Sequence, residues 1–205
     1  MQYSEIKSTF TGILNRRDIT APQITTFIQL GIQYVQRKLR VPPMEKTMEY
    51  TCDGTKNVPI PGDFLELIAI YSDDTSNNNK LEKRDLQTTI RAAQGVGSPT
   101  MFHRNGTNLM IAPVPPEGTI IYVNYYSDAT ALSADTDTNW MTDAAPVLMI
   151  YGALRYASDY FLDDRKAVFA ETFAEELFDI QEMANRDELV AGTMSPLYHD
   201  QINAL

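Results

Sequence analysis

Cysteine and histidine are scarce in this chain of 205 residues, which contains one cysteine, Cys52, and two histidines, His103 and His199. A single cysteine excludes an internal disulfide and any metal site built from several cysteines, and it fits a reducing compartment. Neither histidine has a sequence neighbour at the spacing of a metal site or a nucleophilic triad, so each is interpreted as a surface or hydrogen-bonded side chain. We therefore expect no metal and no cofactor.

Long apolar runs and nucleotide-binding motifs are also missing. The longest apolar run, residues 144–154, is too short for a bilayer core about 30 Å thick, and the N-terminal residues lack the apolar stretch of a signal peptide. No Gly-Lys-Ser/Thr phosphate loop occurs, and Gly95-Val96-Gly97 leads into a strand where a dinucleotide fingerprint requires a helix. We expect a protein that spans no membrane, is not exported by such a signal and binds no nucleotide.

Basic residues are depleted in the second half of the chain. Residues 1–104 carry 13 Lys and Arg against 11 Asp and Glu, whereas residues 105–205 carry 4 against 16, and the net charge is −10. An acidic surface repels phosphates, which disfavours a protein that grips duplex DNA. The first half keeps a basic group, which we interpret as a solvated helix end: Arg16, Arg17, Arg37, Lys38 and Arg40.

Two amphipathic helices are predicted near the N-terminus, over Tyr3–Leu14 and Ala21–Leu39, because apolar residues recur there every three or four positions. Thr20 supplies a start for the second helix, and the proline pair Pro42-Pro43 prevents its continuation, since proline lacks an amide donor. Two further helices are predicted later in the chain.

The first of these later helices follows a loop within residues 138–164 and is apolar on nearly every side, which predicts a core helix or an assembly contact. Gly152 and Ala153 allow a neighbour to approach it closely. The last helix, Arg165–Glu188, is predicted to have one apolar stripe and an acidic opposite face.

The spacing of apolar residues changes to that of strands between Glu45 and Tyr126. Asp53-Gly54 and Asn105-Gly106 are pairs that accept positive φ, so each predicts a two-residue hairpin turn. Residues 73–79 are predicted to be a polar loop, and residues 84–93 a short helix. The predicted strands cover residues 48–51, 56–59, 64–71, 101–104, 109–112 and 119–126.

One loop has the beginning of a calcium motif. Asp135, Asp137 and Asn139 alternate as calcium ligands do, but Trp140 occupies the position of the turn glycine and Pro146 that of the bidentate glutamate. We interpret the segment as a loop whose short polar side chains bond their own backbone.

Two carboxylate pairs have the spacing at which an acid and a base could converge on a helix. They are Asp159 with Asp163 and Glu171 with Glu175. Most such pairs lie on solvated faces or cap helices, so the pattern favours a protein that is not an enzyme.

Several short segments follow one another in a fixed order along nearly the whole chain: Leu39-Arg40 with Pro42, Val58–Glu66, Gly97–Phe102, Leu109–Pro115, Val123–Tyr126, Ala131–Ser133, Thr138–Trp140 and Leu148–Leu154 followed by Tyr160. Each segment alone is only a turn or packing signal. Their succession resembles the head-to-tail adaptor, or connector, proteins of tailed bacteriophages, especially short-tailed phages.

This resemblance and the order of the elements predict an α+β fold. We expect a helical bundle core of two N-terminal and two C-terminal helices, with a β-rich insert and an extended C-terminal tail. The expected segments are a helical pair over residues 1–43, a β-rich insert with one short helix over 44–130, a second helical pair over 131–192 and a tail over 193–205.

The resemblance implies a structural protein of the virion at the head-to-tail junction, assembled in the host cytoplasm. A ring of twelve copies is expected beneath the portal protein, where it extends the DNA channel and forms a platform for downstream tail or nozzle proteins. Double-stranded DNA is expected to pass through the lumen without specific binding, and no membrane is involved.

Two sets of residues are expected to carry this role. The C-terminal tail is expected to order between portal subunits, and its anchors are Met194, Leu197, Tyr198 and Ile202. Acidic residues are expected to line the lumen, where repulsion stops DNA from sticking, and they are Glu171, Glu175, Glu176 and Asp179.

Two rival functions remain open at this point. A lytic enzyme of the virion would use a carboxylate pair such as Asp159 and Asp163 on a cell-wall substrate. A DNA-binding accessory protein would use Arg37, Lys38 and Arg40. The acidity of the chain and the missing motifs argue against both.

Overall fold

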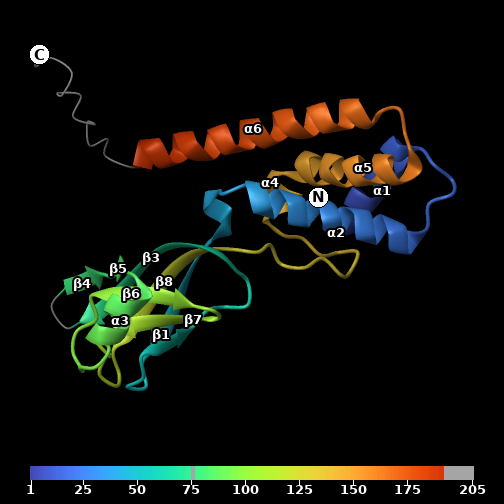
Figure 1. Ribbon diagram of the computed structural model, residues 1–205. Coiled ribbons are helices and arrows are strands. Elements are labelled where there is room, and N and C mark those ends of the chain that lie inside the picture. The colour runs from blue at the N-terminus through green and yellow to red at the C-terminus, as the bar shows by residue number, and fades with distance from the viewer. Residues whose placement is uncertain (75–76, 192–205) are drawn as a thin grey trace, which may run out of the picture. The chain divides into compact units, whose positions relative to one another are not determined.

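The computed structural model describes residues 1–74 and 77–191. Its helices are α1 (Tyr3–Leu14), α2 (Ala21–Lys38), α3 (Leu86–Ala92), α4 (Trp140–Ala144), α5 (Pro146–Phe161) and α6 (Lys166–Ala191) (Figure 1). Its strands are β1 (Glu45–Thr51), β2 (Asn57–Pro59), β3 (Phe64–Asp74), β4 (Asn77–Lys80), β5 (Glu82–Lys83), β6 (Met101–Asn105), β7 (Asn108–Ala112) and β8 (Ile120–Ser127).

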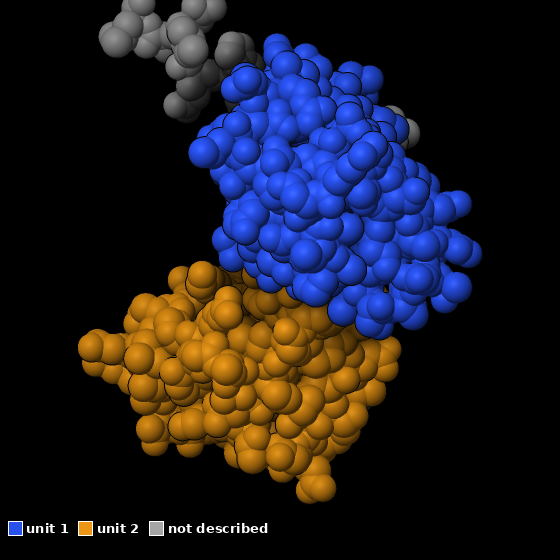
Figure 2. Space-filling view, turned by 90° about the vertical axis from the view of Figure 1, so that its right-hand side faces the viewer, with its two compact units in different colours: residues 1–42, 131–205 blue, residues 43–130 orange. Residues whose placement is uncertain are grey.

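The chain divides into two compact units (Figure 2). The helical unit comprises Met1–Pro42 and Ala131–Leu205, and the sheet unit comprises Pro43–Thr130. Within the described ranges, no helix combines the length and the apolar character needed to cross a membrane.

The predicted core of two N-terminal and two C-terminal helices is wrong. Residues 1–74 and 77–191 form six helices and two four-stranded sheets, with 45% helix and 24% strand. The C-terminal part holds three helices, because α4 ends at Ala144 and α5 begins at Pro146. Ala145 between them has φ −139° and ψ 46°, which is not helical, and Pro146 has no amide to donate to a continuing helix.

The first two helices form where their apolar spacing predicts. The helix α1 has the predicted bounds and buries an apolar side chain at every third or fourth position. The backbone amide of Thr20 donates to Oε1 of Gln23 at 2.8 Å, which closes the first turn of α2. The chain becomes extended at Leu39, so α2 ends one residue earlier than predicted.

The helix α5 is the centre of the helical unit and contacts α1, α2, α4 and α6. A Cβ atom added at Gly31 of α2 would lie 2.7 Å from the backbone nitrogen of Ala153 and 2.9 Å from the backbone carbon of Gly152. The close approach predicted at Gly152 and Ala153 is therefore confirmed. The prediction of a core helix is confirmed, although the Tyr160 side chain near the end of α5 is 62% exposed.

The sheet unit contains two sheets, with strand orders β1-β8-β3-β4 and β2-β7-β6-β5. The first sheet is antiparallel, whereas β5 pairs with β6 in parallel in the second. Apolar side chains of both sheets pack in one core, whose buried members include Val58, Ile70, Phe102, Ile111, Ile121 and Val123. The unit is thus a packed structure of its own.

Only one of the two predicted hairpins exists. The strands β6 and β7 are joined at Asn105 and Asn108, so the two-residue turn is Gly106-Thr107, one residue later than predicted. Gly106 has the expected positive φ of 61°. The hairpin predicted at Asp53-Gly54 is wrong, because β1 pairs with β8 and β2 pairs with β7.

The prediction of a loop over residues 73–79 is also wrong, because both ends of this range belong to strands. The strand β3 continues to Asp74 and pairs with β4, with Asp73 opposite Asn78 and Ser72 opposite Asn79. Backbone hydrogen bonds between the two strands stabilise this extended structure despite the polar side chains, which have low strand propensity.

Candidate assembly surfaces

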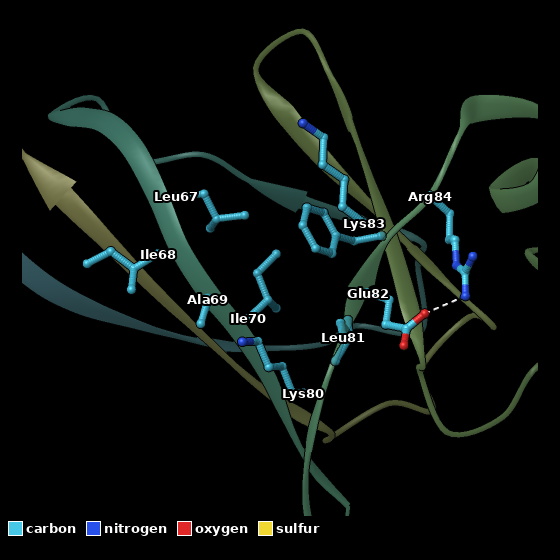
Figure 3. Close-up of a pocket in the computed structure, with 10 residues that line it drawn as sticks. Leu67, Ile68, Ala69, Ile70, Lys80, Leu81, Glu82, Lys83 and Arg84 are labelled. Carbon is cyan, nitrogen blue, oxygen red and sulfur yellow. Dashed lines mark hydrogen bonds and ion pairs between the residues drawn. The ribbon is translucent and has the colours of Figure 1, made fainter. Parts of the chain in front are cut away.

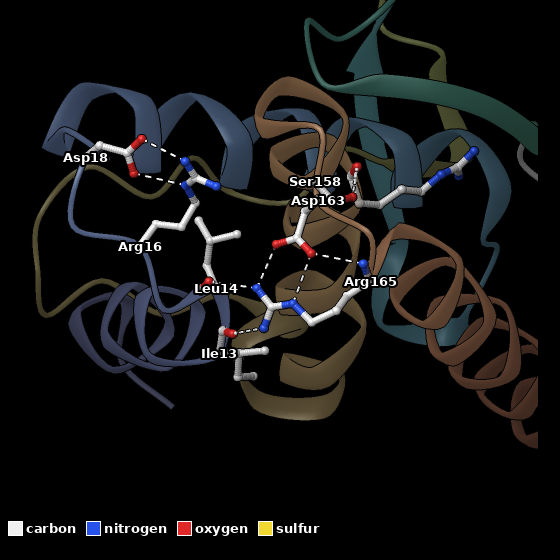
Figure 4. Close-up of polar contacts among 8 residues, drawn as sticks. Ile13, Leu14, Arg16, Asp18, Ser158, Asp163 and Arg165 are labelled. Atoms are coloured by element: carbon white, nitrogen blue, oxygen red, sulfur yellow. Dashed lines mark hydrogen bonds and ion pairs between the residues drawn. The ribbon is translucent and has the colours of Figure 1, made fainter.

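The turn between α5 and α6 is held by one arginine. Leu162 ends α5 in the left-handed conformation, with φ 52°. Arg165 then donates from Nη1 to the carbonyl of Ile13 at 3.0 Å and from Nη2 to that of Leu14 at 2.9 Å (Figure 4). These carbonyls belong to the last turn of α1. The last carbonyls of a helix accept no hydrogen bond from within the helix and carry partial negative charge, so a nearby cation stabilises them. Arg165 therefore ties the start of α6 to the end of α1.

Asp163 completes this clamp. Its carboxylate accepts from Nε of Arg165 at 3.0 Å and from Nη2 at 2.7 Å (Figure 4). The hydrogen bond from Arg165 is the main reason why the pKa of Asp163 falls from 3.8 to about 2. Asp159, the other half of the suspected catalytic pair, forms an ion pair with Lys166. A general acid needs a raised pKa, so Asp163 does not suit that role, and both carboxylates of the pair are engaged in ion pairs beside the α5–α6 turn.

Large apolar side chains are exposed from this turn along α6. The exposed fraction is 89% for Leu162 and 59% for Val168, and further along it is 65% for Phe178 and 64% for Met183. We call these four residues the exposed apolar set. Several such side chains on one element, outside the core, are typical of a surface that contacts another protein.

The predicted apolar stripe of α6 is present. Phe169, Phe173 and Ala184 are buried, and Leu177 and Ile180 are partly buried. The opposite face is less uniform than predicted, because the exposed apolar set interrupts its acidic residues.

Three of the four predicted acidic residues share one face of α6. Glu171, Glu175 and Asp179 are exposed and follow one another at intervals of four residues, which places them on one side of a helix. Glu176 lies beside this row and is partly buried. The row is an exposed line of like charge, and its place on a channel wall stays a prediction.

The side chains of the loop with the partial calcium motif bond backbone amides of the loop and of the first turn of α4. The carboxylate of Asp137 accepts from the backbone amides of Ser133 and Ala134, each at 2.7 Å. Oδ1 of Asn139 accepts from the amide of Met141 at 3.0 Å and caps α4. The interpretation as a capping loop is confirmed. No group of three or more His, Cys, Asp and Glu side chains suited to a metal occurs in residues 1–74 and 77–191.

The basic group near the N-terminus divides between structural and solvated positions. Arg16 pairs with Asp18 at 2.9 Å (Figure 4). Its guanidinium group also lies over the ring of Phe161. Nη1 of Arg40 donates to backbone carbonyls at the end of α2. The side chains of Arg37 and Lys38 are exposed in the last turn of that helix, where a cation is favourable, which agrees with the interpretation as a solvated helix end.

The histidines and the expected portal anchors are the remaining candidates. The Nδ1 atom of His103 is 2.9 Å from the carbonyl oxygen of Arg84 in the sheet unit. His199 and the four expected portal anchors, Met194, Leu197, Tyr198 and Ile202, lie outside the described residues.

One further feature was not predicted from the sequence. An open groove of about 680 Å³ lies in the sheet unit and is lined by apolar and basic side chains (Figure 3). Its walls come from β3, from residues 80–84 and from β6, which are separated along the chain, so no local pattern indicated it.

The surfaces described above, an apolar set beside an acidic row on one long helix, define a protein that acts through contacts with other macromolecules. A model of the SU10 adaptor protein family matches residues 1–197. The chain belongs to this family of phage head-tail adaptors and is a component of the virion. A search of curated proteins finds no match to the chain.

Proposed function

We propose that the chain assembles as a ring of twelve beneath the portal protein, extends the DNA channel and forms the platform on which downstream tail or nozzle proteins dock. The observation that carries the proposal is the adaptor family match over residues 1–197. A closed ring requires each copy to contact the next through two different surfaces. The exposed apolar set on the α5–α6 turn and α6 supports one of these surfaces.

The acidic row of α6 is proposed to face the lumen. Duplex DNA is a polyanion, and a wall of like charge keeps it from binding as it slides. Glu171, Glu175 and Asp179 offer such a line of charge on one helix face. This proposal concerns repulsion, so it requires no specific DNA contact.

The tail is proposed to insert between portal subunits and to become ordered as it binds. Its apolar side chains, Met194, Leu197, Tyr198 and Ile202, would supply the anchors. Apolar anchors that fill pockets commonly supply most of the binding free energy at an interface.

Electron microscopy of the purified chain, alone and mixed with portal, tests the ring. We expect rings of twelve copies coaxial with the portal in the mixture. Rings of another symmetry would contradict the dodecamer, and a chain that stays unbound would contradict the adaptor role. Deletion of residues 193–205 is expected to abolish portal binding, and unchanged binding would reject the role of the tail.

A further inference from the structure

The groove of the sheet unit lies between two strand edges. On one side β3 pairs with β8 along its length. On its other side β4 covers Tyr71–Asp74, and the amide of Leu81 donates to the carbonyl of Ile70 at 2.9 Å. The earlier part of β3 therefore borders the groove. The strand β5 ends the second sheet, with β6 as its paired neighbour. A strand edge that borders a groove is a place where a further strand can add.

The floor of the groove is apolar. Leu67 and Ile70 come from β3, and Leu81 follows β4 (Figure 3). Phe102 comes from β6. Ile70, Leu81 and Phe102 are buried, whereas Ile68 at the border is 40% exposed. Alternate side chains of an extended peptide would point into such a floor, since successive residues of a strand face opposite ways.

The border of the groove is basic, in contrast to the chain as a whole. An adjoining recess shares Leu67, Lys83 and Phe102 with the groove and adds Arg104. The groove and the recess together are lined by four basic side chains, Lys80, Lys83, Arg84 and Arg104, and by two acidic ones, Glu66 and Glu82. Glu82 is paired with Arg84. The excess is positive in a chain whose net charge is −10.

We infer that this groove binds an extended acidic segment of a partner polypeptide, which adds as a strand at the edge of β3. The strand edge supplies backbone hydrogen bonds, the apolar floor accepts alternate side chains, and the basic border pairs with the acidic ones. A duplex nucleic acid fits less well, because acidic side chains share the lining and the floor is apolar. The inference concerns the sheet unit and holds whatever ring the chain forms.

A synthetic probe tests the inference on the full chain. The probe is a short fluorescein-labelled peptide in which valine and glutamate alternate, and fluorescence anisotropy measures its binding. We expect it to bind at least about tenfold more tightly than the same peptide with lysine in place of glutamate. Equal binding of the two peptides, or tighter binding of duplex DNA, would overturn the inference.

Charge reversal locates the binding. Lys83→Glu with Arg104→Glu, both at exposed side chains, is expected to weaken glutamate-peptide binding by about tenfold or more and to favour the lysine peptide. Arg91→Glu, at an exposed site on α3 of the same unit, is the matched control for Lys83→Glu alone and should leave binding unchanged. An equal effect of the control would show a general charge effect and reject the groove.

Hydrogen exchange separates strand addition from loose contact. Backbone amides in residues 65–69 that face the groove are expected to exchange more slowly when the probe is bound, because the added strand forms new hydrogen bonds with this edge. Saturating binding with no change of exchange in this range would show that the peptide does not add to β3.

Discussion

At the scale of single residues, glycine sets how closely the two central helices approach. Gly31 of α2 and Gly152 of α5 are in contact, with the Cβ position of Gly152 lying 3.4 Å from Cα of Gly31. The sequence indicated Gly152 because it stands in an apolar helix. It did not indicate Gly31, since the contact joins segments far apart in the chain.

Gly31→Ala is expected to lower the free energy of unfolding by about 1–3 kcal/mol, because the new Cβ would lie 2.7 Å from the backbone nitrogen of Ala153. Backbone atoms cannot move aside as a flexible side chain can. Gly12→Ala in α1 is the control, because its Cβ would meet nothing within 4 Å. The control should be neutral or stabilising by up to about 1 kcal/mol. Urea unfolding measures both, and equal effects would contradict the close contact.

The clamp at Asp163 makes a prediction about pH. The pKa of Asp163 is lowered from 3.8 in the unfolded chain to about 2 in the folded protein, mainly by the hydrogen bond from Arg165. The carboxylate therefore stabilises the fold above pH 3.8, and this contribution is lost as the pH falls towards 2. Asp163→Asn should flatten the fall in the free energy of unfolding over that range. Asp164→Asn is the control, and an identical pH profile for Asp163→Asn and the wild type would contradict the clamp.

At the scale of elements, local patterns predicted single helices and strands better than their pairing. The helix α1 has its predicted bounds because its apolar spacing and its burial coincide. The chain does bend at Gly54, which has φ 78°, but the strands on either side of the bend belong to different sheets. Turn chemistry is local, whereas β1 pairs with β8 much later in the chain. The core was mispredicted for a different reason, since the break at Ala145 is a local change of backbone conformation that the apolar pattern does not reveal.

The candidate sites were likewise predicted where their contacts are local in the sequence and missed where they are not. The capping role of Asn139 was predicted because its partners lie within a few residues. The hydrogen bonds from Arg165 to Ile13 and Leu14 join segments of the helical unit that are far apart in the sequence, so no local spacing could reveal them.

The acidic row gives the prediction for α6 as an element. Glu171→Gln, Glu175→Gln and Asp179→Asn together remove three like charges from one helix face. With repulsion reduced, duplex DNA is expected to bind the assembled protein at least about tenfold more tightly at low salt. A mobility-shift assay over a salt series measures this change.

The control removes the same number of charges elsewhere. Glu45→Gln, Glu49→Gln and Glu117→Gln change exposed side chains of the sheet unit. A second measurement is the amount of DNA that stays inside portal-bound particles. If the row lines the channel, this amount should rise for the α6 variant and not for the control. An equal gain in DNA retention from the control variant would show that only net charge matters.

At the scale of the whole molecule, the charge division between the sequence halves does not follow the two compact units. The helical unit carries 10 basic and 16 acidic residues, and the sheet unit carries 7 and 11. Both units are therefore acidic. Attraction between a neutral and an acidic unit therefore cannot hold neighbouring copies together, so the contacts of the proposed ring are expected to come from local surfaces such as the exposed apolar set.

Phe178→Ser with Met183→Ser tests this conclusion. Both side chains are nearly two-thirds exposed, so the free energy of unfolding of one chain should change by no more than about 0.5 kcal/mol per site. Burial of an apolar side chain in an interface contributes on the order of 1.5–3 kcal/mol, so ring formation on the portal should weaken by about tenfold or more for each residue. Val96→Ser, at a side chain 75% exposed in the sheet unit, is the matched control. Electron microscopy should then show few rings for the double variant and normal rings for the control, whereas normal rings for both would place the contacts between copies elsewhere.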